Sequence, residues 1–430
     1  MRIFTAIMPN DLLTKNKFSR WLIIFSLVFA GEMIFSLPFH IARFFRPTFL
    51  EVFRLTNAEL GDAIAIYGIM AMLAYFPGGT LADRFSARKL MSISLFATAF
   101  GGVFLAQIPG QFGLSILFGY WGVTTIFLFW GAMIKTTRNW GGKLSQGKAF
   151  GILDGGRGLI AAGAATLAVI FLSKMLPNPD DATELQRSGA LKTIIYYYTL
   201  LTFAAAIVVW FIIPDSSPGK TNSEKNLFSG ISKVIRNRTV WLQAIIVVCA
   251  YSGYKGLDYY SLYAVDVLGM NEVDAAQFVS NASYLRAVAA IGAGLLVDRL
   301  SASKVISWTF GLLVISYFTL SMIGPNNTLL LIIYGNIIFT FIAVYALRGV
   351  YFSLLEETKI RSSLTGTAVG LISVIGYTPD AFFNSVAGRI LDASPGLKGH
   401  QHFYMMLAAF SVIGLVATVV LVYIKKEKNI

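Results

Sequence analysis

Cysteine, histidine and charged residues are all scarce in this chain of 430 residues. It has one cysteine, Cys249, and three histidines, and only 13% of its residues are charged, against about 25% in a soluble domain. A single cysteine rules out a disulfide framework and a cysteine-based metal site within the chain. Because 56% of the residues are hydrophobic, a soluble fold would expose more apolar surface than water tolerates. The composition predicts a protein that crosses a membrane several times.

The sequence also lacks the motifs of nucleotide and metal enzymes. It contains no Gly-x-x-x-x-Gly-Lys-Ser/Thr loop, so we expect no ATP-driven step, and it contains no His-Glu-x-x-His pair. The glycine-rich stretch from Gly151 to Gly158 has no strand before it and is typical of close helix packing. We therefore expect that the protein is not an enzyme and binds no cofactor or metal.

Long apolar runs dominate the sequence instead. A helix that crosses a hydrocarbon core of roughly 30 Å needs about 20 apolar residues, and none of the runs alternates as a barrel strand does. Twelve runs are long enough, near residues 21–50, 59–81, 89–107, 112–135, 148–174, 193–213, 240–266, 273–297, 303–324, 328–355, 363–391 and 402–424. The sequence predicts an all-α integral membrane protein with twelve transmembrane helices.

The positive charges predict how these helices are oriented. If the chain starts in the cytoplasm, 23 Lys and Arg residues fall in cytoplasmic segments and 8 fall in outer segments. Cytoplasmic loops carry such an excess of Lys and Arg, so we expect both termini in the cytoplasm and the protein in a bacterial inner membrane. The net charge of +13 then faces anionic lipid, and we expect no nucleic-acid partner.

A polar linker and an internal repeat predict two equivalent halves. Residues 214–239 have the composition of a flexible linker and separate residues 1–213 from residues 240–430. The stretch Gly79 to Leu90 aligns without a gap on Gly294 to Val305, with seven of twelve positions identical. We predict two pseudo-symmetric six-helix bundles, an architecture found among secondary transporters.

The loop Gly79-x-x-x-Asp83-Arg84-x-x-x-Arg88-Lys89 resembles the signature of the major facilitator superfamily, and the resemblance covers essentially the whole chain. Its variant with Ser86 and Ala87 resembles the organophosphate:phosphate antiporter branch, as do the segments around Arg43 and around Lys255. In that branch two cations, one in each half, hold the substrate phosphate; here Lys255 stands in place of an Arg. The resemblance also implies a gating role for Asp83, Arg84, Arg88, Asp298 and Arg299.

Ionisable residues inside the predicted spans are the main functional signal. Each costs at least about 2.5–3.5 kcal/mol at mid-bilayer and normally faces a cavity or a partner. Asp154 and Arg157 are three residues apart, a spacing that favours a local pair. Lys255 and Asp258 have the same spacing, whereas Arg348 has no acid, and Glu32 no cation, within one turn. The candidates for binding substrate are Arg43, Lys255, Asp258, Tyr259, Arg286 and Arg348, and the candidates for coupling to protons are Glu32, Asp154 and Asp380.

Five cations against four acids within the spans favour a negatively charged solute. We expect a monomeric secondary active transporter for a small organic anion, either a phosphorylated sugar or polyol or a carboxylate, working by antiport or by proton symport, with phosphate or protons as the coupling ion. Two alternatives remain open. One is a proton-coupled exporter of neutral or cationic compounds, and the other is a membrane sensor that keeps a transporter fold.

Overall fold

The computed structural model describes residues 17–142, 146–215, 234–325, 329–357 and 362–427, and these ranges are helical with no strand among them. The helices before the linker are α1 (Lys17–Phe35), α2 (Ile41–Phe44), α3 (Arg46–Phe53), α4 (Asn57–Arg84), α5 (Ala87–Leu105), α6 (Gln111–Val123), α7 (Gly131–Gly141), α8 (Gln146–Met175) and α9 (Glu184–Ile212). Those after it are α11 (Arg238–Gly256), α12 (Tyr260–Asp266), α13 (Glu272–Ser283), α14 (Leu285–Arg299), α15 (Ala302–Met322), α16 (Leu330–Val350), α17 (Leu354–Glu357), α18 (Ser362–Gly376), α19 (Pro379–Ala393) and α20 (Leu397–Glu427).

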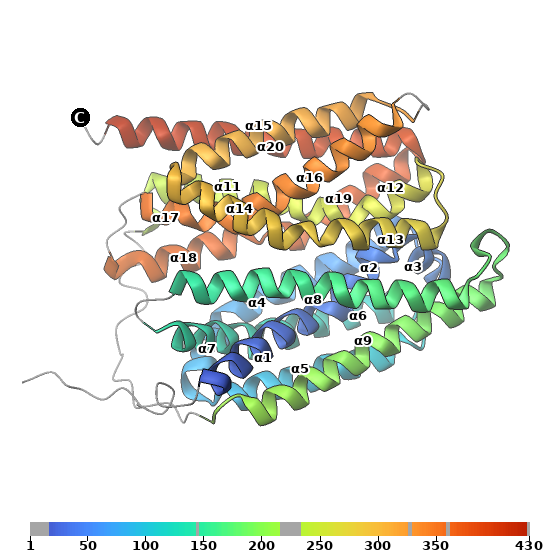
Figure 1. Ribbon diagram of the computed structural model, residues 1–430, viewed down its shortest axis with the longest axis horizontal. Coiled ribbons are helices and arrows are strands. Elements are labelled where there is room, and N and C mark those ends of the chain that lie inside the picture. Colours follow the sequence, from blue (N-terminus) through green and yellow to red (C-terminus); the bar gives the residue numbers. More distant parts are fainter. Residues whose placement is uncertain (1–16, 143–145, 216–233, 326–328, 358–361, 428–430) are drawn as a thin grey trace, which may run out of the picture.

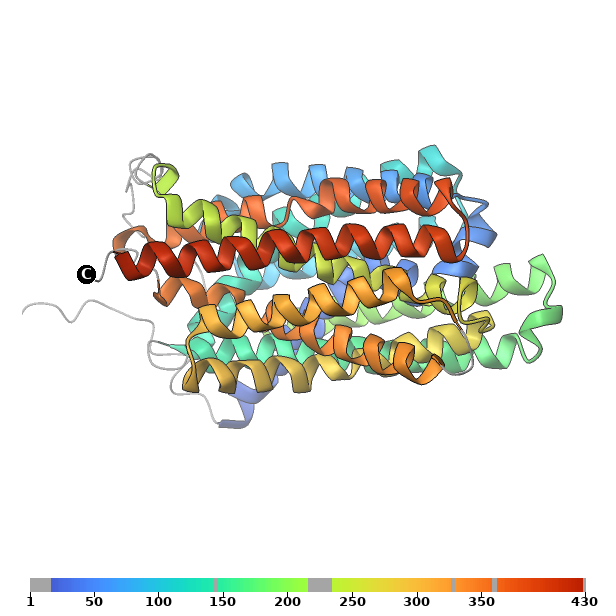
Figure 2. The same cartoon turned by 90° about the horizontal axis from the view of Figure 1, so that it is seen from above.

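The helices gather into two groups that lie against each other. Helices α1 to α9 form the lower group in Figure 1 and α11 to α20 the upper one, and most run roughly along the long axis (Figures 1 and 2). The start of α1, the end of α9, the start of α11 and the end of α20 all lie at one end of the molecule, here called the linker end. The two ends of the described chain therefore emerge on the same side.

Eleven helices in the described chain are long and apolar enough to cross a membrane. The predicted span at 363–391 does not form one of them, because it consists of two 15-residue helices, α18 and α19. The break falls at Tyr377 and Thr378, directly before Pro379 at the start of α19. Thr378 keeps helical backbone angles (φ −56°, ψ −25°), but proline lacks a backbone N–H and cannot continue the hydrogen bonding of the preceding helix, so it is accepted at the first position of a new one.

The repeated sequence stretch adopts the same backbone conformation in its two copies. Phe85 ends α4 at φ −118°, ψ 161°, and Leu300 ends α14 at φ −119°, ψ 174°. The next residues, Ser86 and Ser301, are extended as well, and α5 and α15 begin directly after them. The sequence repeat is thus matched by a repeated tight turn between two helices.

Polar contacts join the two helix groups at the end opposite the linker, here called the closed end. Glu272, at the start of α13, accepts hydrogen bonds from Thr48 (2.6 Å) and Arg187 (2.7 Å) of the first group. Asp392 of α19 accepts from the backbone N–H groups of Asn57 (3.1 Å) and Ala58 (2.7 Å). These N–H groups begin α4 and have no partner within their own helix, so a carboxylate from one group caps a helix of the other.

Glycines bring α4 and α19 into backbone contact beside this cap. A Cβ atom added to Gly61 would lie 2.2 Å from the carbonyl oxygen of Asn384, and one added to Gly388 would lie 2.3 Å from that of Asn57. A Cβ on Gly68 would meet the backbone of Asp380 at 2.2 Å. No side chain fits at these positions while the helices stay in place, so the close approach of α4 and α19 depends on three glycines, of which Gly61 and Gly388 lie at the closed end.

We expect Gly388→Leu to force α4 and α19 apart and to open the closed end. Spin labels at Gln107 and Lys398, two exposed positions at this end, would report a longer distance in a variant whose Cys249 has been replaced. Gly335→Leu is the matched control, since a Cβ there has open space around it. An unchanged distance in Gly388→Leu would show that the backbone contact does not hold this end closed.

Candidate functional site

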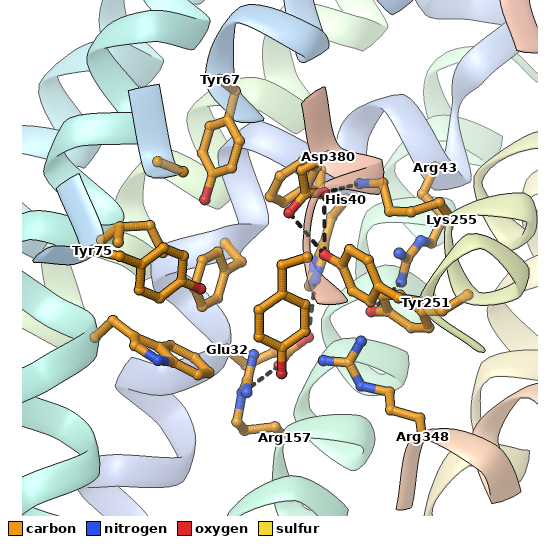
Figure 3. A pocket seen from close by; sticks show the side chains of 17 residues that line it. Glu32, His40, Arg43, Tyr67, Tyr75, Arg157, Tyr251, Lys255, Arg348 and Asp380 are labelled. Carbon is orange, nitrogen blue, oxygen red and sulfur yellow. Dashed lines mark hydrogen bonds and ion pairs between the residues drawn. The ribbon is translucent and has the colours of Figure 1, made fainter. Parts of the chain in front are cut away.

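A cavity lies between the two helix groups and is lined by charged and aromatic side chains (Figure 3). Its free volume of about 80 Å³ corresponds to several water molecules at ~10–15 Å³ each, so a sugar-sized solute requires side chains to move. The ionisable lining residues, apart from tyrosines, are Glu32, His40, Arg43, Arg157, Lys255, Arg348 and Asp380. The aromatic lining residues are Phe35, Phe39, Tyr67, Tyr75, Trp130, Tyr251, Tyr254 and Tyr377.

The first membrane helix supplies five of these residues from one face. Glu32, Phe35, Phe39, His40 and Arg43 follow one another at steps of one, three or four residues, which keeps them on one side of a helix. The helix changes to a π-helical turn over residues 36–40, which include a proline, before α2 resumes the α-helical form. Such turns are frequent at functional sites, and this one carries two of the five lining residues.

Glu32 is the centre of one buried charge cluster. Its carboxylate accepts hydrogen bonds from Nε of Arg157 (3.0 Å) and Nε2 of His40 (3.1 Å), and it lies 3.6 Å from a guanidinium nitrogen of Arg286. The sequence shows no cation within one turn of Glu32, but its partners come from α8, from α14 and from His40, eight residues farther along its own segment. The apparent isolation of Glu32 therefore disappears in the fold.

Asp154 pairs with a residue of the other helix group and not with its sequence neighbour. Arg286 donates to Oδ1 of Asp154 at 2.8 Å, while Arg157, three residues after Asp154, is bound to Glu32. The predicted local pair of Asp154 and Arg157 is thus replaced by a bridge between α8 and α14. The side chain of Asp154 remains about one third exposed, the most accessible of the three proton-coupling candidates.

A second cluster joins α2 to α11, its following turn and α19. Arg43 donates to Asp258 at 2.5 Å, and Lys255 lies 3.5 Å from Asp258 and 3.1 Å from Asp380. The hydroxyl of Tyr251 donates to both oxygens of Asp380 (Figure 3). The local pair predicted for Lys255 and Asp258 does form. Lys255 also forms an ion pair with Asp380 on α19, so carboxylates neutralise its positive charge.

The two halves contribute to this cluster from corresponding positions. Arg43 and Asp258 are 215 residues apart, the same offset as between the two copies of the repeated turn. At that offset Phe39 corresponds to Tyr254, and each ring carries a cation from the other half: Lys255 lies 4.2 Å from the centroid of Phe39, and Arg43 lies 4.7 Å from that of Tyr254. Equivalent positions of the two sequence repeats therefore contact each other across the interface between the halves.

Arg348 differs from Arg43, Arg157, Lys255 and Arg286, which are buried and bound to carboxylates. Its guanidinium lies 3.9 Å from the centroid of the Tyr254 ring and points into the cavity (Figure 3). No acid in the described part of the chain forms an ion pair with it, and one of its terminal nitrogens is buried without a hydrogen-bond partner there. The local sequence had shown no nearby acid, and the tertiary structure adds none among the described residues.

Tyr259 does not line the cavity. Its side chain is fully buried, its hydroxyl donates to Asn384, and the guanidinium of Arg46 lies 4.0 Å from its ring centroid. We therefore leave Tyr259 out of the site proposed below. Asp258 and Arg286 also lie outside the lining, behind Arg43 and Glu32, so they act on the cavity through their partners.

The residues of the repeated turn lie at the ends of α4 and α14 and do not line the cavity. Arg84, Asp298 and Arg299 are exposed there. Arg88 donates to Asp215, just after α9, at 2.6 Å and lies 5.1 Å from the centroid of the Trp210 ring. The side chain of Asp83 lies outside the described residues.

Most of the aromatic lining was not predicted. Trp130 ends a second π-helical turn, residues 124–130, and Tyr377 occupies the break before α19. Tyr377 immediately precedes a Thr-Pro-Asp sequence, which is a local signal for a helix interruption near Asp380. No local feature separates Trp130 or Tyr75 from aromatic residues that face lipid.

Comparisons with known proteins agree on one family. The model of the Major Facilitator Superfamily matches residues 21–383. The chain is 28% identical to the inner membrane protein YihN of Escherichia coli K12, over 96% of both chains. It is 26% identical to the probable nitrate/nitrite antiporter NarK1 of Thermus thermophilus, over 69% of this chain and 64% of that one. The crystal structure of the nucleoside transporter NupG matches with a TM-score of 0.73 at 12% identity, over 94% of this chain and 99% of that one, and shows the fold alone.

The two kinds of buried charge should respond differently to neutralisation. Glu32→Gln leaves Arg157 and Arg286 facing each other without their shared carboxylate, and breaking a buried ion pair costs about 3–5 kcal/mol. We expect a lower Tm for Glu32→Gln in detergent and an unchanged or higher Tm for Arg348→Gln, which strands no acid. Glu32→Asp is the charge-keeping control. Equal Tm values for the two neutral variants would contradict the assignment of paired and unpaired charges.

Proposed function

We propose that this chain, which belongs to the major facilitator superfamily of transporters, carries a small organic anion across the bacterial inner membrane by alternating access. It is a multi-pass protein of that membrane, as its relatives are. The observation that carries the proposal is Arg348, a cavity-facing cation without an acidic partner in the described chain. The nitrate/nitrite name of one relative also indicates anions.

The charges around the cavity support an anionic solute. Arg43, Arg157, Lys255 and Arg286 are each bound to carboxylates, which leaves their pairs close to neutral. A guanidinium in a low-dielectric site is costly unless a counter-charge reaches it. A bound anion provides that counter-charge, and the planar guanidinium can donate two parallel hydrogen bonds to a carboxylate or a related group. A neutral or cationic solute has no such complement here.

We place the linker end in the cytoplasm, because the excess of Lys and Arg falls there. We take residues 1–213 and 240–430 as the two moving halves and residues 214–239 as their connection. The hydrogen bonds described between the halves gather at the closed end and around the cavity, so this conformation is closed toward the outside. Arg84, Arg88, Asp83, Asp298 and Arg299, at the cytoplasmic turns, are proposed to control closure on the opposite side.

The coupling step is proposed to involve Asp154 or Asp380 rather than Glu32. A proton on Glu32 would leave Arg157 without its counter-charge and would leave Arg286 with Asp154 alone. Asp154 is partly exposed and holds one cation from the other half, so its protonation would release Arg286 and loosen one bridge between the halves. Asp380 sits in the cavity wall beside Lys255. Both proton symport and anion exchange are compatible with such a release.

We expect Arg348→Gln to lower uptake of the transported anion by at least about 30-fold, because losing one partner of a buried charge pair costs 2–5 kcal/mol. Purified protein is first exposed to gluconate, glucuronate, glucose 6-phosphate and glucose, and the compound that raises Tm most is then followed into proteoliposomes. Arg348→Lys should keep part of the uptake. Arg236→Gln, which removes an exposed cation, is the control. Strongest stabilisation by neutral glucose, with full uptake in Arg348→Gln, would refute the anion proposal.

A further inference from the structure

The charge of the buried cluster also limits the charge of the solute, an inference that rests on the proposed function. Five cations are gathered there: Arg43, Arg157, Lys255, Arg286 and Arg348. Four carboxylates, those of Glu32, Asp154, Asp258 and Asp380, are bound to the first four cations. With His40 neutral, the cluster carries one net positive charge, and that charge is on Arg348.

One unpaired cation matches one negative charge. We propose that the transported solute presents a singly charged headgroup, such as a carboxylate, a sulfonate or a sulfate ester, and that a phosphate monoester is accepted only as its monoanion. A dianion would neutralise Arg348 and leave one uncompensated negative charge in the cavity. Burying an unpaired charge is strongly unfavourable, so the dianion should be excluded even where its shape fits.

The second cation expected to hold a phosphate is already occupied. The amine of Lys255 lies 3.1 Å from Asp380, 3.5 Å from Asp258 and 4.2 Å from the centroid of the Phe39 ring. Arg43 donates its Nε to Asp258 and a terminal nitrogen to the hydroxyl of Tyr254. If Lys255 or Arg43 bound the second negative charge of a phosphate, it would have to give up an ion pair with a carboxylate. Arg348 forms no ion pair with a described residue, so it can bind an anion without breaking one.

The cavity walls place the headgroup on one side. The C-terminal half supplies Arg348 together with the hydroxyl groups of Tyr251, Tyr254 and Tyr377. The N-terminal half faces them with the apolar side chains of Phe35, Phe39, Ile126 and Trp130, and its own lining cations are bound to carboxylates. A solute with a charged end toward the C-terminal half and C–H groups toward the aromatic wall fits this division.

A matched pair of ligands separates charge from shape. Methyl sulfate and methyl phosphate have the same tetrahedral head, but the sulfate carries one charge, and a phosphate monoester carries nearly two at pH 7.5 because its second pKa is about 6. Glucose 6-sulfate and glucose 6-phosphate repeat the comparison on a larger body. We expect calorimetric titration of the purified protein at pH 7.5 to give at least 10-fold tighter binding of each sulfate.

Lowering the pH provides the second arm of the test. Between pH 7.5 and pH 5.5 the monoanionic fraction of a phosphate ester rises about 20-fold for a pKa near 6. We expect the affinity for each phosphate, divided by that for its sulfate, to rise by at least this factor. The sulfate keeps its charge, so the ratio removes any effect of pH that acts equally on both ligands, and a proton on His40, Asp154 or Asp380 adds a positive charge to the cluster that favours the phosphate further.

Removing one carboxylate from the cluster should reverse the preference. Asp380→Asn frees Lys255 from one partner and raises the net charge by one, so the phosphate dianion should gain at least 10-fold relative to the sulfate at pH 7.5. Asp180→Asn removes an exposed carboxylate from the loop before α9 and should change nothing. Tighter binding of the phosphates by the unmodified protein at pH 7.5 would overturn the single-charge rule and leave the anion proposal standing. Equal binding of glucose and its charged derivatives, or binding of none of the anions, would overturn the anion proposal as well.

Discussion

Neutralisation of buried charge is the constraint on which this structure depends. Nine ionised side chains meet where the two helix groups face each other, and an unpaired ion in such surroundings costs several kcal/mol. The cost is met by pairing across the groups: Arg43 with Asp258, and Arg286 with Glu32 and Asp154. The same pairs therefore stabilise the fold and join the halves. Any movement that separates the halves must break them or exchange their partners.

Helix α19 connects this cluster to the closed end. It begins next to the cavity, where Asp380 is bound by Lys255 and Tyr251, and it ends at Asp392, which caps α4. Between these two residues its backbone lies directly against Gly61 and Gly68 of α4. Because packed helices move as rigid elements, a change in the contacts of Asp380 can be passed to the closed end along one helix. The proline that starts α19 marks the break that separates this helix from α18.

The site also shows how a repeated sequence becomes a paired structure. Two copies of one helical unit bring positions 215 residues apart to opposite sides of the same interface. Arg43 and Asp258 are such a pair and carry opposite charges. A gene duplication alone would place like residues opposite each other, so the two halves have diverged at the point of contact into complementary partners. Arg348 has no charged counterpart in this scheme, since the residue 215 positions earlier is Met133.

The sequence by itself determined the class of the protein: apolar runs of bilayer length, the turn repeated at 79–90 and 294–305, and the family resemblance are all local or periodic features. It also identified the ionisable residues that gather between the two helix groups, because charge within an apolar run is conspicuous. Only the tertiary structure decided how those charges combine. Arg157 has Asp154 one turn away in the sequence but forms its ion pair with Glu32 of another helix. Lys255 forms ion pairs with both Asp258 and Asp380. Partners of this kind depend on how helices pack, and spacing along one helix carries no information about its neighbours. For Arg348 the sequence and the structure give the same answer. The sequence has no acid within one turn of it, and no acid of the described helices forms an ion pair with it.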